Sequence, residues 1–386
     1  MATTSLPLEG IRVVEFTHMV MGPTCGMILA DLGAEVIKVE PPGGDKTRKL
    51  PGLGIGFFRT FNRNKKSVVL DLESAAGRAD ALALIGASDV LLENFRPGYM
   101  AALGLDYAAL AARFPRLIYV SMKGFLPGPY ERRTALDEVV QMMGGLSYMT
   151  GPPGRPLRAG TSVNDIMGGM FGALGALAAL RERERTGRGQ EVQSALFENC
   201  VFLCAQHLQQ YLMTGEPPPP MSARVSAWSV YDVFTLAEGE QLFIGAVSDK
   251  QFVALCNVLG CPELAREPQF ATNAARVAAR PELLARLAPI FARQRVAPLS
   301  AALEAAGLPF APIVRPEQLL DDPHLKASGG IVPMATDDGG MTQVVPLPLL
   351  LAGRRPPVRR PLPRAGEHTE QVLAALGRAA DRSTKA

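Results

Sequence analysis

The feature of this sequence that most limits its fold is an apolar, glycine-rich segment over residues 160–180. Thr161 or Ser162 can cap a helix at its start, and Thr186-Gly187 can end it. Nearly every position from Ile166 to Leu180 is apolar or glycine, which predicts a helix buried on all sides. The uncharged stretch is shorter than the roughly 20 residues that a membrane span needs, so the segment favours a core helix.

Two features of this segment need a physical reason. Its glycines at 168, 169, 172 and 175 lower helix propensity, so we expect other backbone or a ligand to come close there. Asp165 is the one charged residue of the segment and lies in the first turn. It could simply complement the helix dipole. Alternatively, it is a carboxylate at the mouth of a buried, glycine-lined cleft, kept ionised and nucleophilic by the helix N-terminus.

The overall charge argues against a nucleic-acid-binding protein. The 40 basic and 37 acidic residues leave a formal net charge of +3, although a local basic cluster could still hold a phosphorylated small molecule. The first residues lack the pattern of a secretory signal and the five cysteines form no tight framework, which predicts reduced thiols in a cytoplasmic protein. Cys200 and Cys204 could form half a metal site, but only His207 is near, so we expect core packing and no metal.

The first half of the chain alternates strand-type and helix-type segments. Apolar strands are predicted at 11–16, 35–40, 67–72, 89–93, 117–122 and 191–195, with helices at 22–31, 75–85, 99–103, 107–113 and 196–213. This alternation predicts an α/β fold with a parallel sheet covered on both faces. Ligands of such sheets bind at the carboxyl edge, where the strand-to-helix loops gather. The first of these loops lacks the G-x-G-x-x-G fingerprint, so dinucleotide binding is not supported.

Basic and polar residues fall in the loops expected at that edge. They are His18, the pair Lys65-Lys66, the turn from Asn94 to Gly98, and Lys123. Cations at strand ends suit phosphate groups. A pair of lysines beside a strand is just as often a solvated sheet edge, so both interpretations stay open for Lys65-Lys66.

The chain divides by composition into three parts. Residues 1–215 hold the strand and helix alternation, and the stiff run from Pro217 to Pro220 marks a boundary. Residues 222–325 predict a smaller α+β unit with two strands between 228 and 247 and helices at 249–259, 281–293 and 298–306. Residues 326–386 return to complete the large domain, with an amphipathic helix at 367–376 expected to pack on it.

Taken together, these stretches resemble the class III CoA-transferase family, which contains formyl-CoA transferase, carnitine CoA-transferase and the α-methylacyl-CoA racemases. The resemblance covers essentially the whole chain and is carried by six motifs in the family's order. They are the segments Leu8–Phe16, Ala30–Glu40, Asn62–Ser67, Glu93–Gly98, Val120–Gly124 and Thr186–Gln190.

The resemblance implies a Rossmann-like large domain built from both ends of the chain, a small domain from its middle, and a homodimer of interlocked chains. It implies that Asp165 is the nucleophile, attacking an acyl-CoA thioester to give an anhydride and then an aspartyl-CoA thioester. Backbone N–H groups are expected to face the oxyanions. Glu138 matches a carboxylate that some members use beside the nucleophile. CoA is then a substrate and no permanent cofactor is implied.

The family's CoA contacts also map onto this chain. They correspond to His18, Val20, the segment Leu70, Asp71, Leu72 and Glu73, the pair Asn94 and Phe95, and Lys123. Two arginines common in the family are absent, since Ala101 and Ala102 stand in one place and Pro41 and Pro42 in the other. Arg96, Arg48 or Lys66 are candidates to replace them at the CoA phosphates.

The family resemblance is compatible with several activities, and individual residues help to distinguish them. Racemases of the family use a histidine where this chain has Leu136, which removes one of their two bases. Val20 replaces a glutamine of the oxalate enzymes, which argues against oxalate. Arg224, Arg132 and Arg133 could bind a second carboxylate, so we expect a small dicarboxylate acceptor with succinyl-CoA as donor. A protein that binds CoA esters without catalysing transfer is the alternative from a different class.

Overall fold

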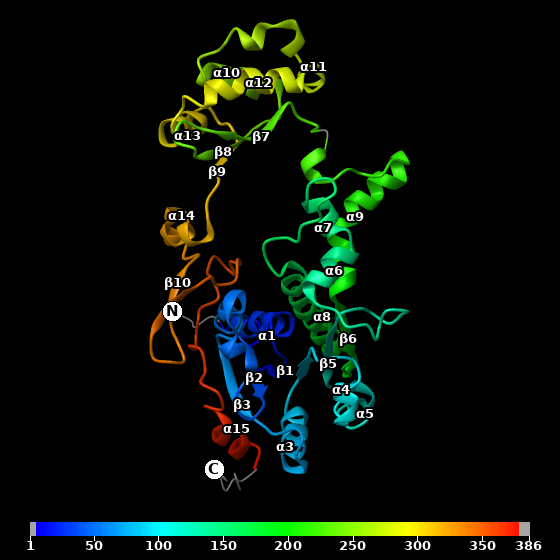
Figure 1. Cartoon of the computed structure of the whole chain (residues 1–386). Coiled ribbons are helices and arrows are strands. Elements are labelled where there is room, and N and C mark those ends of the chain that lie inside the picture. Colours follow the sequence, from blue (N-terminus) through cyan, green and yellow to red (C-terminus); the bar gives the residue numbers. More distant parts are fainter. Residues whose placement is uncertain (1–4, 225, 378–386) are drawn as a thin grey trace. The chain divides into compact units, whose positions relative to one another are not determined.

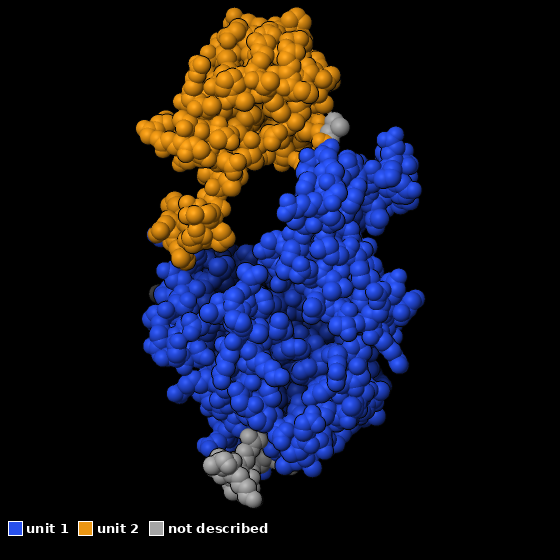
Figure 2. All heavy atoms as spheres, in the orientation of Figure 1, with its two compact units in different colours: residues 1–223, 326–386 blue, residues 224–325 orange. Residues whose placement is uncertain are grey.

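A computed structural model describes residues 5–224 and 226–377 of the chain. Its contacts divide the chain into two compact units, shown in different colours in Figure 2. The first unit combines the segment that ends at Ala223 with the segment that begins at Lys326, and the second is Arg224–Leu325. The second unit is therefore an insertion into the first.

The first unit is built on a six-stranded sheet with the order β3-β2-β1-β4-β5-β6, in which every neighbouring pair is parallel. The strands are β1 Arg12–Phe16, β2 Glu35–Glu40, β3 Lys65–Val69, β4 Val90–Glu93, β5 Ile118–Lys123 and β6 Glu191–Ala195. The prediction of a parallel α/β sheet is confirmed. The strand order reverses between β1 and β4: β1 pairs with β2 on one side and with β4 on the other, and the chain continues outward from each. Ligands of this type of sheet bind at such a switch point.

Successive side chains of each strand point to opposite faces of the sheet and pack into two different hydrophobic clusters. Val13 and Val120 face one cluster, which helices α1 (Met21–Asp31) and α8 (Val163–Thr186) complete (Figure 1). Val14 and Tyr119 face the other, with α3 (Ala75–Gly86), α4 (Tyr99–Ala102), α5 (Tyr107–Ala111) and α15 (Thr369–Ala375). Val372 and Leu373 of α15 are buried in this second cluster, so the prediction that the C-terminal helix packs on the first domain is confirmed.

The first unit contains further elements beside this layered core, to which three of them contribute buried side chains. They are α2 (Phe57–Phe61), α6 (Asp137–Met143), α7 (Leu146–Thr150), α9 (Leu196–Thr214), the hairpin β10 (Val332–Ala335) and β11 (Met341–Val344), and the 3₁₀ turns η1 (Lys46–Lys49), η2 (Gly52–Gly56) and η3 (Met221–Ala223). Of these, only α9 was predicted from the sequence. The short helices lack the repeated apolar spacing that periodicity arguments need.

The central glycines allow α1 and α8 to pack in close contact. A Cβ on Gly169 would lie 2.6 Å from the carbonyl oxygen of Met21, and one on Gly168 would lie 2.4 Å from the Met21 side chain. Further along, a Cβ on Gly172 would lie 3.3 Å from the Cys25 sulfur. The expectation that other backbone comes close is confirmed at Gly169, whereas Gly168 and Gly172 meet side chains. The contacts advance in step along two helices that run in the same direction.

The prediction that α8 is buried on all sides is wrong for this chain by itself. Met170 and Leu174 are 54% and 59% exposed, and they lie one helical turn apart on one face. Leu212 and Met213 at the end of α9 are also exposed, at 71% and 84%. α8 is the one helix in the described residues with the length and hydropathy of a membrane span, yet its other face is packed in the core, as in a soluble protein's central helix.

The second unit has its own core and its own sheet. The antiparallel strands β7 (Val230–Thr235), β8 (Gln241–Ala246) and β9 (Phe310–Pro312) pair in the order β7-β8-β9. Their apolar sides pack with the helices into one hydrophobic cluster. The helices are α10 (Asp249–Val258), α11 (Asn273–Ala278), α12 (Arg280–Phe291) and α13 (Val296–Ala305), with the turns η4 (Leu264–Arg266), η5 (Pro268–Phe270) and η6 (Pro316–Asp321). The short helix α14 (Pro323–Ala327) spans the point where the chain passes back to the first unit.

Candidate active site

The loops that leave β1 and β4 meet at the switch point of the sheet. The backbone N–H of His18 donates to Oδ1 of Asn94 at 3.0 Å, and Nδ2 of Asn94 donates to the carbonyl of His18 at 2.9 Å. The rings of His18 and Phe95 stack with centroids 5.4 Å apart. Three residues that the sequence predicted as a group are therefore assembled around one amide side chain.

The surroundings of the His18 side chain favour its neutral form. Burial lowers the pKa of His18, as does the positive charge of Lys38, and these effects outweigh the opposing influences of Asp45 and Asn94. Nδ1 of His18 is buried and has no hydrogen-bond partner among the described residues. A neutral imidazole with an unused ring nitrogen can donate or accept one hydrogen bond to a ligand.

A buried cluster beneath the His18 loop fixes its backbone. Nζ of Lys38 donates to the carbonyl of Thr17 at 2.7 Å and lies 3.0 Å from Oδ2 of Asp45. Thr47 accepts the N–H of Met19 at 3.2 Å. Met19 has φ +63°, a left-handed conformation that is strained for a residue with a side chain. The cluster thus holds a turn that the loop would not adopt by preference.

Lys123 is held by an internal ion pair. Its Nζ lies 2.6 Å from Oε2 of Glu93 and donates to the carbonyl of Phe95 at 2.7 Å. Ser121 donates to the other oxygen of Glu93 at 2.7 Å. Lys123 therefore fixes the backbone of the Asn94-Phe95 turn, and its charge is balanced before any ligand binds.

The other residues predicted to contact CoA differ in their exposure. The side chains of Val20 and Leu70 are buried in the two hydrophobic clusters. Asp71 and Glu73 are exposed and Leu72 is half-buried. Glu73 accepts a hydrogen bond from the Tyr99 hydroxyl at 3.4 Å, which joins this segment to the Phe95 side of the switch point because the rings of Phe95 and Tyr99 touch.

Asp165 lies at the start of α8 next to a second carboxylate, Asp137. Oδ1 of Asp137 accepts the backbone N–H groups of Asn164 at 2.8 Å and Asp165 at 3.2 Å. Asp137 therefore caps α8, whereas Ser162 stands at the N-cap position without a side-chain hydrogen bond, and the predicted cap is wrong. Because these two N–H groups are occupied, an oxyanion would need other donors.

The structure corrects the expectation that the helix N-terminus keeps Asp165 ionised. Burial, and next the negative charge of Asp137, raise the pKa of Asp165 to about 7, against a smaller opposing effect of Arg158. The favourable dipole is outweighed because desolvation penalises the charged form and a like charge lies close. Near neutral pH this carboxyl group is present in both protonation states.

Glu138 is placed differently from its neighbour. Its side chain is 56% exposed and lies 3.4 Å from Nη1 of Arg158. Asp137 is buried and lies 3.7 Å from Nη2 of the same arginine. Sequence reasoning missed Asp137; its position at the start of α6, next to the mapped Glu138, was the available signal.

The two parts of the site belong to the same end of the α1–α8 pair. Asp165 lies one helical turn before Gly169, and Gly169 packs on the Met21 carbonyl at the start of α1. His18 lies three residues before Met21. A separate cavity of about 320 Å³ at the carboxyl ends of β4 to β6 is lined by Lys123, but not by Asp165 or His18.

Comparisons with known proteins decide the family. The model of CoA-transferase family III matches residues 8–369. The succinate–glutarate CoA-transferase of Agrobacterium fabrum is 36% identical, covering 96% of both chains, and a succinyl-CoA–D-citramalate CoA-transferase of Chloroflexus aurantiacus is 35% identical over 96% of this chain and 94% of its own. The crystal structure of a CaiB/BaiF family protein from Brucella suis superposes with a TM-score of 0.87 at 34% identity, covering 97% of this chain and all of that one. The chain belongs to CoA-transferase family III.

In this family III CoA-transferase, two of the three cations considered for the CoA phosphates are already paired. Arg48 contacts Glu40 at 2.7 Å and Asp337 at 3.0 Å, and Lys66 contacts Glu35 at 2.5 Å. Arg96 is exposed at the switch-point turn. Arg224 is exposed at the start of the second unit, and Arg132 and Arg133 lie in an exposed loop, where Arg133 stacks over Tyr130. Arg96 is thus the candidate that the fold leaves available at this edge.

The described residues of the transferase contain no group of three or more His, Cys, Asp or Glu side chains that could hold a metal ion. Cys200 and Cys204 are buried, and burial raises the pKa of the Cys204 thiol to about 11. Thiols with such pKa values are poor nucleophiles and poor metal ligands at neutral pH. Burial therefore leaves both thiols unactivated.

Proposed function

We propose that this enzyme moves CoA from succinyl-CoA to a small dicarboxylic acid, with Asp165 as the nucleophile. The observation that carries the proposal is the placement of Asp165, a partly buried carboxyl group with a pKa of about 7, at the same end of α1 and α8 as the His18–Asn94 turn. The relatives named for succinate, glutarate and citramalate support the class of acid.

The carboxylate of Asp165 attacks the thioester carbonyl, the C–S bond breaks, and an acyl-aspartyl anhydride and CoA thiolate form. The thiolate then attacks the aspartyl carbonyl, which releases the donor acid and leaves an aspartyl-CoA thioester. The acceptor carboxylate attacks that thioester to form a second anhydride and free thiolate. The thiolate finally attacks the acceptor's acyl carbon and restores Asp165. Covalent exchange keeps the thioester energy away from water.

The surrounding residues have supporting roles in this proposal. Asp137 orients the first turn of α8, and its charge raises the basicity and so the nucleophilicity of Asp165. His18, Asn94 and Phe95 bind the CoA ester, and Arg96 contacts its phosphates. Glu138 acts beside the nucleophile through Arg158. Leu136 at the N-cap of α6 supplies no second base, which disfavours the racemase alternative.

We also propose an oligomeric state and a cellular location for the enzyme. The exposed apolar faces of α8 and α9 would be covered by a second copy in the interlocked homodimer of the family. We place the enzyme in the cytoplasm, where its five buried, unpaired cysteines would stay reduced. Arg224 would contact the second carboxylate of the acid.

A donor–acceptor matrix tests the substrate class. Purified enzyme is incubated with succinyl-CoA, acetyl-CoA or a bulky acyl-CoA, against succinate, glutarate, citramalate, oxalate and monocarboxylic acids. Exchange confined to monocarboxylic or bulky acids would rule out a small dicarboxylic acid as the acceptor.

Trapping tests the nucleophile separately. Hydroxylamine added with an acyl-CoA should convert Asp165 to a hydroxamate that mass spectrometry detects. Asp165→Asn should abolish transfer while CoA still binds. Retained transfer in that variant would overturn the mechanism, and binding without transfer in the unmodified enzyme would make the chain a CoA-ester-binding protein.

A further inference from the structure

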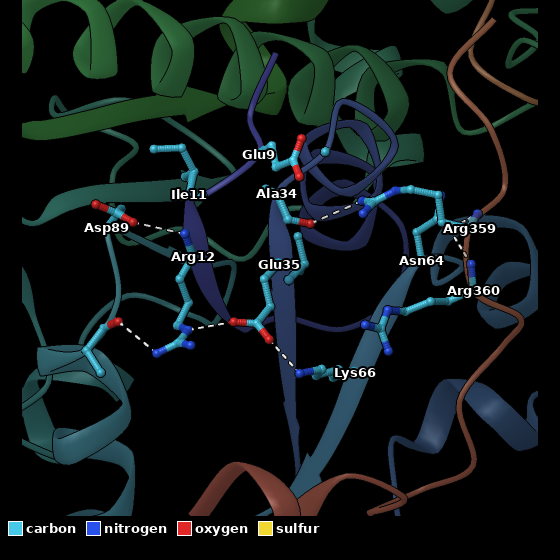
Figure 3. A pocket seen from close by; sticks show the side chains of 14 residues that line it. Glu9, Ile11, Arg12, Ala34, Glu35, Asn64, Lys66, Asp89, Arg359 and Arg360 are labelled. Atoms are coloured by element: carbon cyan, nitrogen blue, oxygen red, sulfur yellow. Dashed lines mark hydrogen bonds and ion pairs between the residues drawn. The ribbon is translucent and has the colours of Figure 1, made fainter. Parts of the chain in front are cut away.

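A cavity lies at the amino edge of the sheet, away from the switch point. It has a volume of about 520 Å³ and is formed by the starts of β1 and β2, Lys66 of β3, and the return segment at Arg359 and Arg360 (Figure 3). β1 runs from Arg12 at this cavity to Phe16 at the other edge, roughly 13 Å at the rise of an extended strand. The cavity is therefore separate from the candidate active site, and its size lies in the range of small-molecule pockets.

The charges in this cavity do not balance. Four cationic side chains line it: Arg12, Lys66, Arg359 and Arg360. Glu35 is shared by two of them, since it lies 2.7 Å from Nε of Arg12 and 2.5 Å from Nζ of Lys66. These two hydrogen bonds outweigh the effect of burial and hold the pKa of Glu35 below its usual value. Glu35 thus stays ionised, but its single negative charge cannot neutralise the positive charges of both Arg12 and Lys66.

The other carboxylates of the lining add little. Asp89 is paired at 2.9 Å with Arg183, which does not line the cavity. The Glu9 carboxylate is exposed at the rim and makes no hydrogen bond or ion pair in the described structure. Burial, followed by the positive charge of Arg360, lowers the pKa of Arg359, against the opposing charges of Asp31 and Glu9.

The backbone that carries the two arginines is held rigidly by Asn64. Oδ1 of Asn64 accepts the N–H groups of Arg359 at 2.6 Å and Arg360 at 2.8 Å, and its own N–H donates to the carbonyl of Arg360. Nδ2 of Asn64 donates to buried Asp31 at 2.7 Å. Asn64 itself has φ +64°, a conformation that asparagine tolerates better than most residues. The return segment is therefore fixed before any ligand arrives.

Arg360 is the side chain that this arrangement leaves unused. Nη2 of Arg359 donates to the carbonyl of Ala30 at 2.5 Å, but the Arg360 guanidinium has no hydrogen-bond or ion-pair partner in the described structure. Figure 3 shows it extending from the return segment toward Glu35 and Lys66. A guanidinium on a fixed backbone, with further cations facing it, is arranged to bind an anion through paired hydrogen bonds.

We propose that this amino-edge cavity binds a compact polyanion, a small molecule with two or more phosphate or carboxylate groups. Arg360 provides the main contact and Lys66, Arg12 and Arg359 the surrounding positive charge. The lining contains no aromatic side chain on which a nucleobase could stack, so a nucleotide is not the expected ligand. The site is distinct from the binding of acyl-CoA at the carboxyl edge and does not depend on Asp165.

Isothermal titration of the full chain with pyrophosphate and with citrate tests the proposal. Either anion should bind at low ionic strength and more weakly as salt rises, because the contacts are charge-assisted. Binding of pyrophosphate alone assigns the site to phosphorylated ligands, and binding of citrate alone to polycarboxylates. Arg360→Gln should weaken the binding at least tenfold, as expected for loss of one charge-assisted pair. Arg360→Lys, which keeps the charge but loses the fork, should fall between.

Arg293→Gln is the matched control because it removes an exposed arginine that the proposed CoA site does not use. It should change the anion affinity less than twofold. No binding of either anion at low salt, or binding that Arg360→Gln leaves intact, would overturn the proposal. The titrations are repeated in the Asp165→Asn background, where binding should be unchanged, so that failure of this site and failure of the proposed transfer mechanism are told apart.

Discussion

Replacing Asp165 by Asn should make the protein more stable at high pH, although it removes the proposed nucleophile. The folded state raises the pKa of this carboxyl group from the ordinary 3.8 to about 7. Between these two values the unfolded chain is ionised while the folded chain still holds its proton. Stability is therefore lost as the pH rises through this window, and above pH 7 the full cost of a buried charge remains.

The size of the effect follows from the same two values. The gap between 3.8 and about 7 corresponds to an upper limit of roughly 4 kcal/mol, at about 1.4 kcal/mol per pH unit. Partial exposure of Asp165 reduces this, so we expect about 2–4 kcal/mol in favour of Asp165→Asn at pH 8. At pH 5 less than half of the difference should remain. For a domain of this size, that corresponds to roughly 5 °C in Tm at the higher pH.

Thermal denaturation of the variant and the unmodified protein from pH 5 to pH 8.5 measures this directly. Glu138→Gln is the matched control: it removes an exposed carboxylate close to Asp137, and its effect on stability should stay within about 0.5 kcal/mol at every pH. A difference between Asp165→Asn and the unmodified protein that is independent of pH, or that grows toward low pH, would refute the reasoning.

Three further predictions concern the same site. Asp137→Asn keeps an oxygen to cap α8 but removes the charge, so the rising limb of kcat/KM against pH, expected near pH 7, should move to lower pH. Thr47→Val removes the acceptor for the strained turn of the first loop and should raise KM for the CoA ester several-fold, with that limb unmoved in the pH profile. Gly169→Ala places a methyl group against a backbone carbonyl and should lower Tm by the equivalent of about 1–3 kcal/mol or more, whereas Gly160→Ala, where nothing lies within 4 Å, should leave thermal denaturation unchanged.

The parallel sheet and its helices could be predicted because most strands are rich in apolar residues and each long helix ends at a recognisable signal. The strand at 35–40 and the end of α8 at Gly187, which has φ +72°, agree with the structure residue by residue. β3 begins two residues earlier than predicted, since Lys65 and Lys66 belong to it. Their apolar stems and internal ion pairs let lysines occupy a buried strand, which a hydrophobicity pattern cannot reveal.

The site was predictable as a set of residues but not as a set of contacts. Asn94 and His18 were found by motif, whereas the cap formed by Asp137 joins residues 27 or more positions apart. The pKa of Asp165 depends on that contact and on burial, so the sequence suggested an ionised group where the fold produces a half-protonated one. The exposed face of α8 was missed because composition does not tell which apolar side chains a single chain covers.

The interrupted connectivity of the first unit has a consequence for its synthesis. The segment that supplies Arg359, Arg360 and α15 is made after the whole inserted unit, so the growing chain can complete the later unit first. Until the last residues leave the ribosome, the cluster around Val372 and Leu373 stays open and Asn64 lacks its backbone partners. The first unit can therefore be completed only after the second has been made, although most of its residues precede it in the chain.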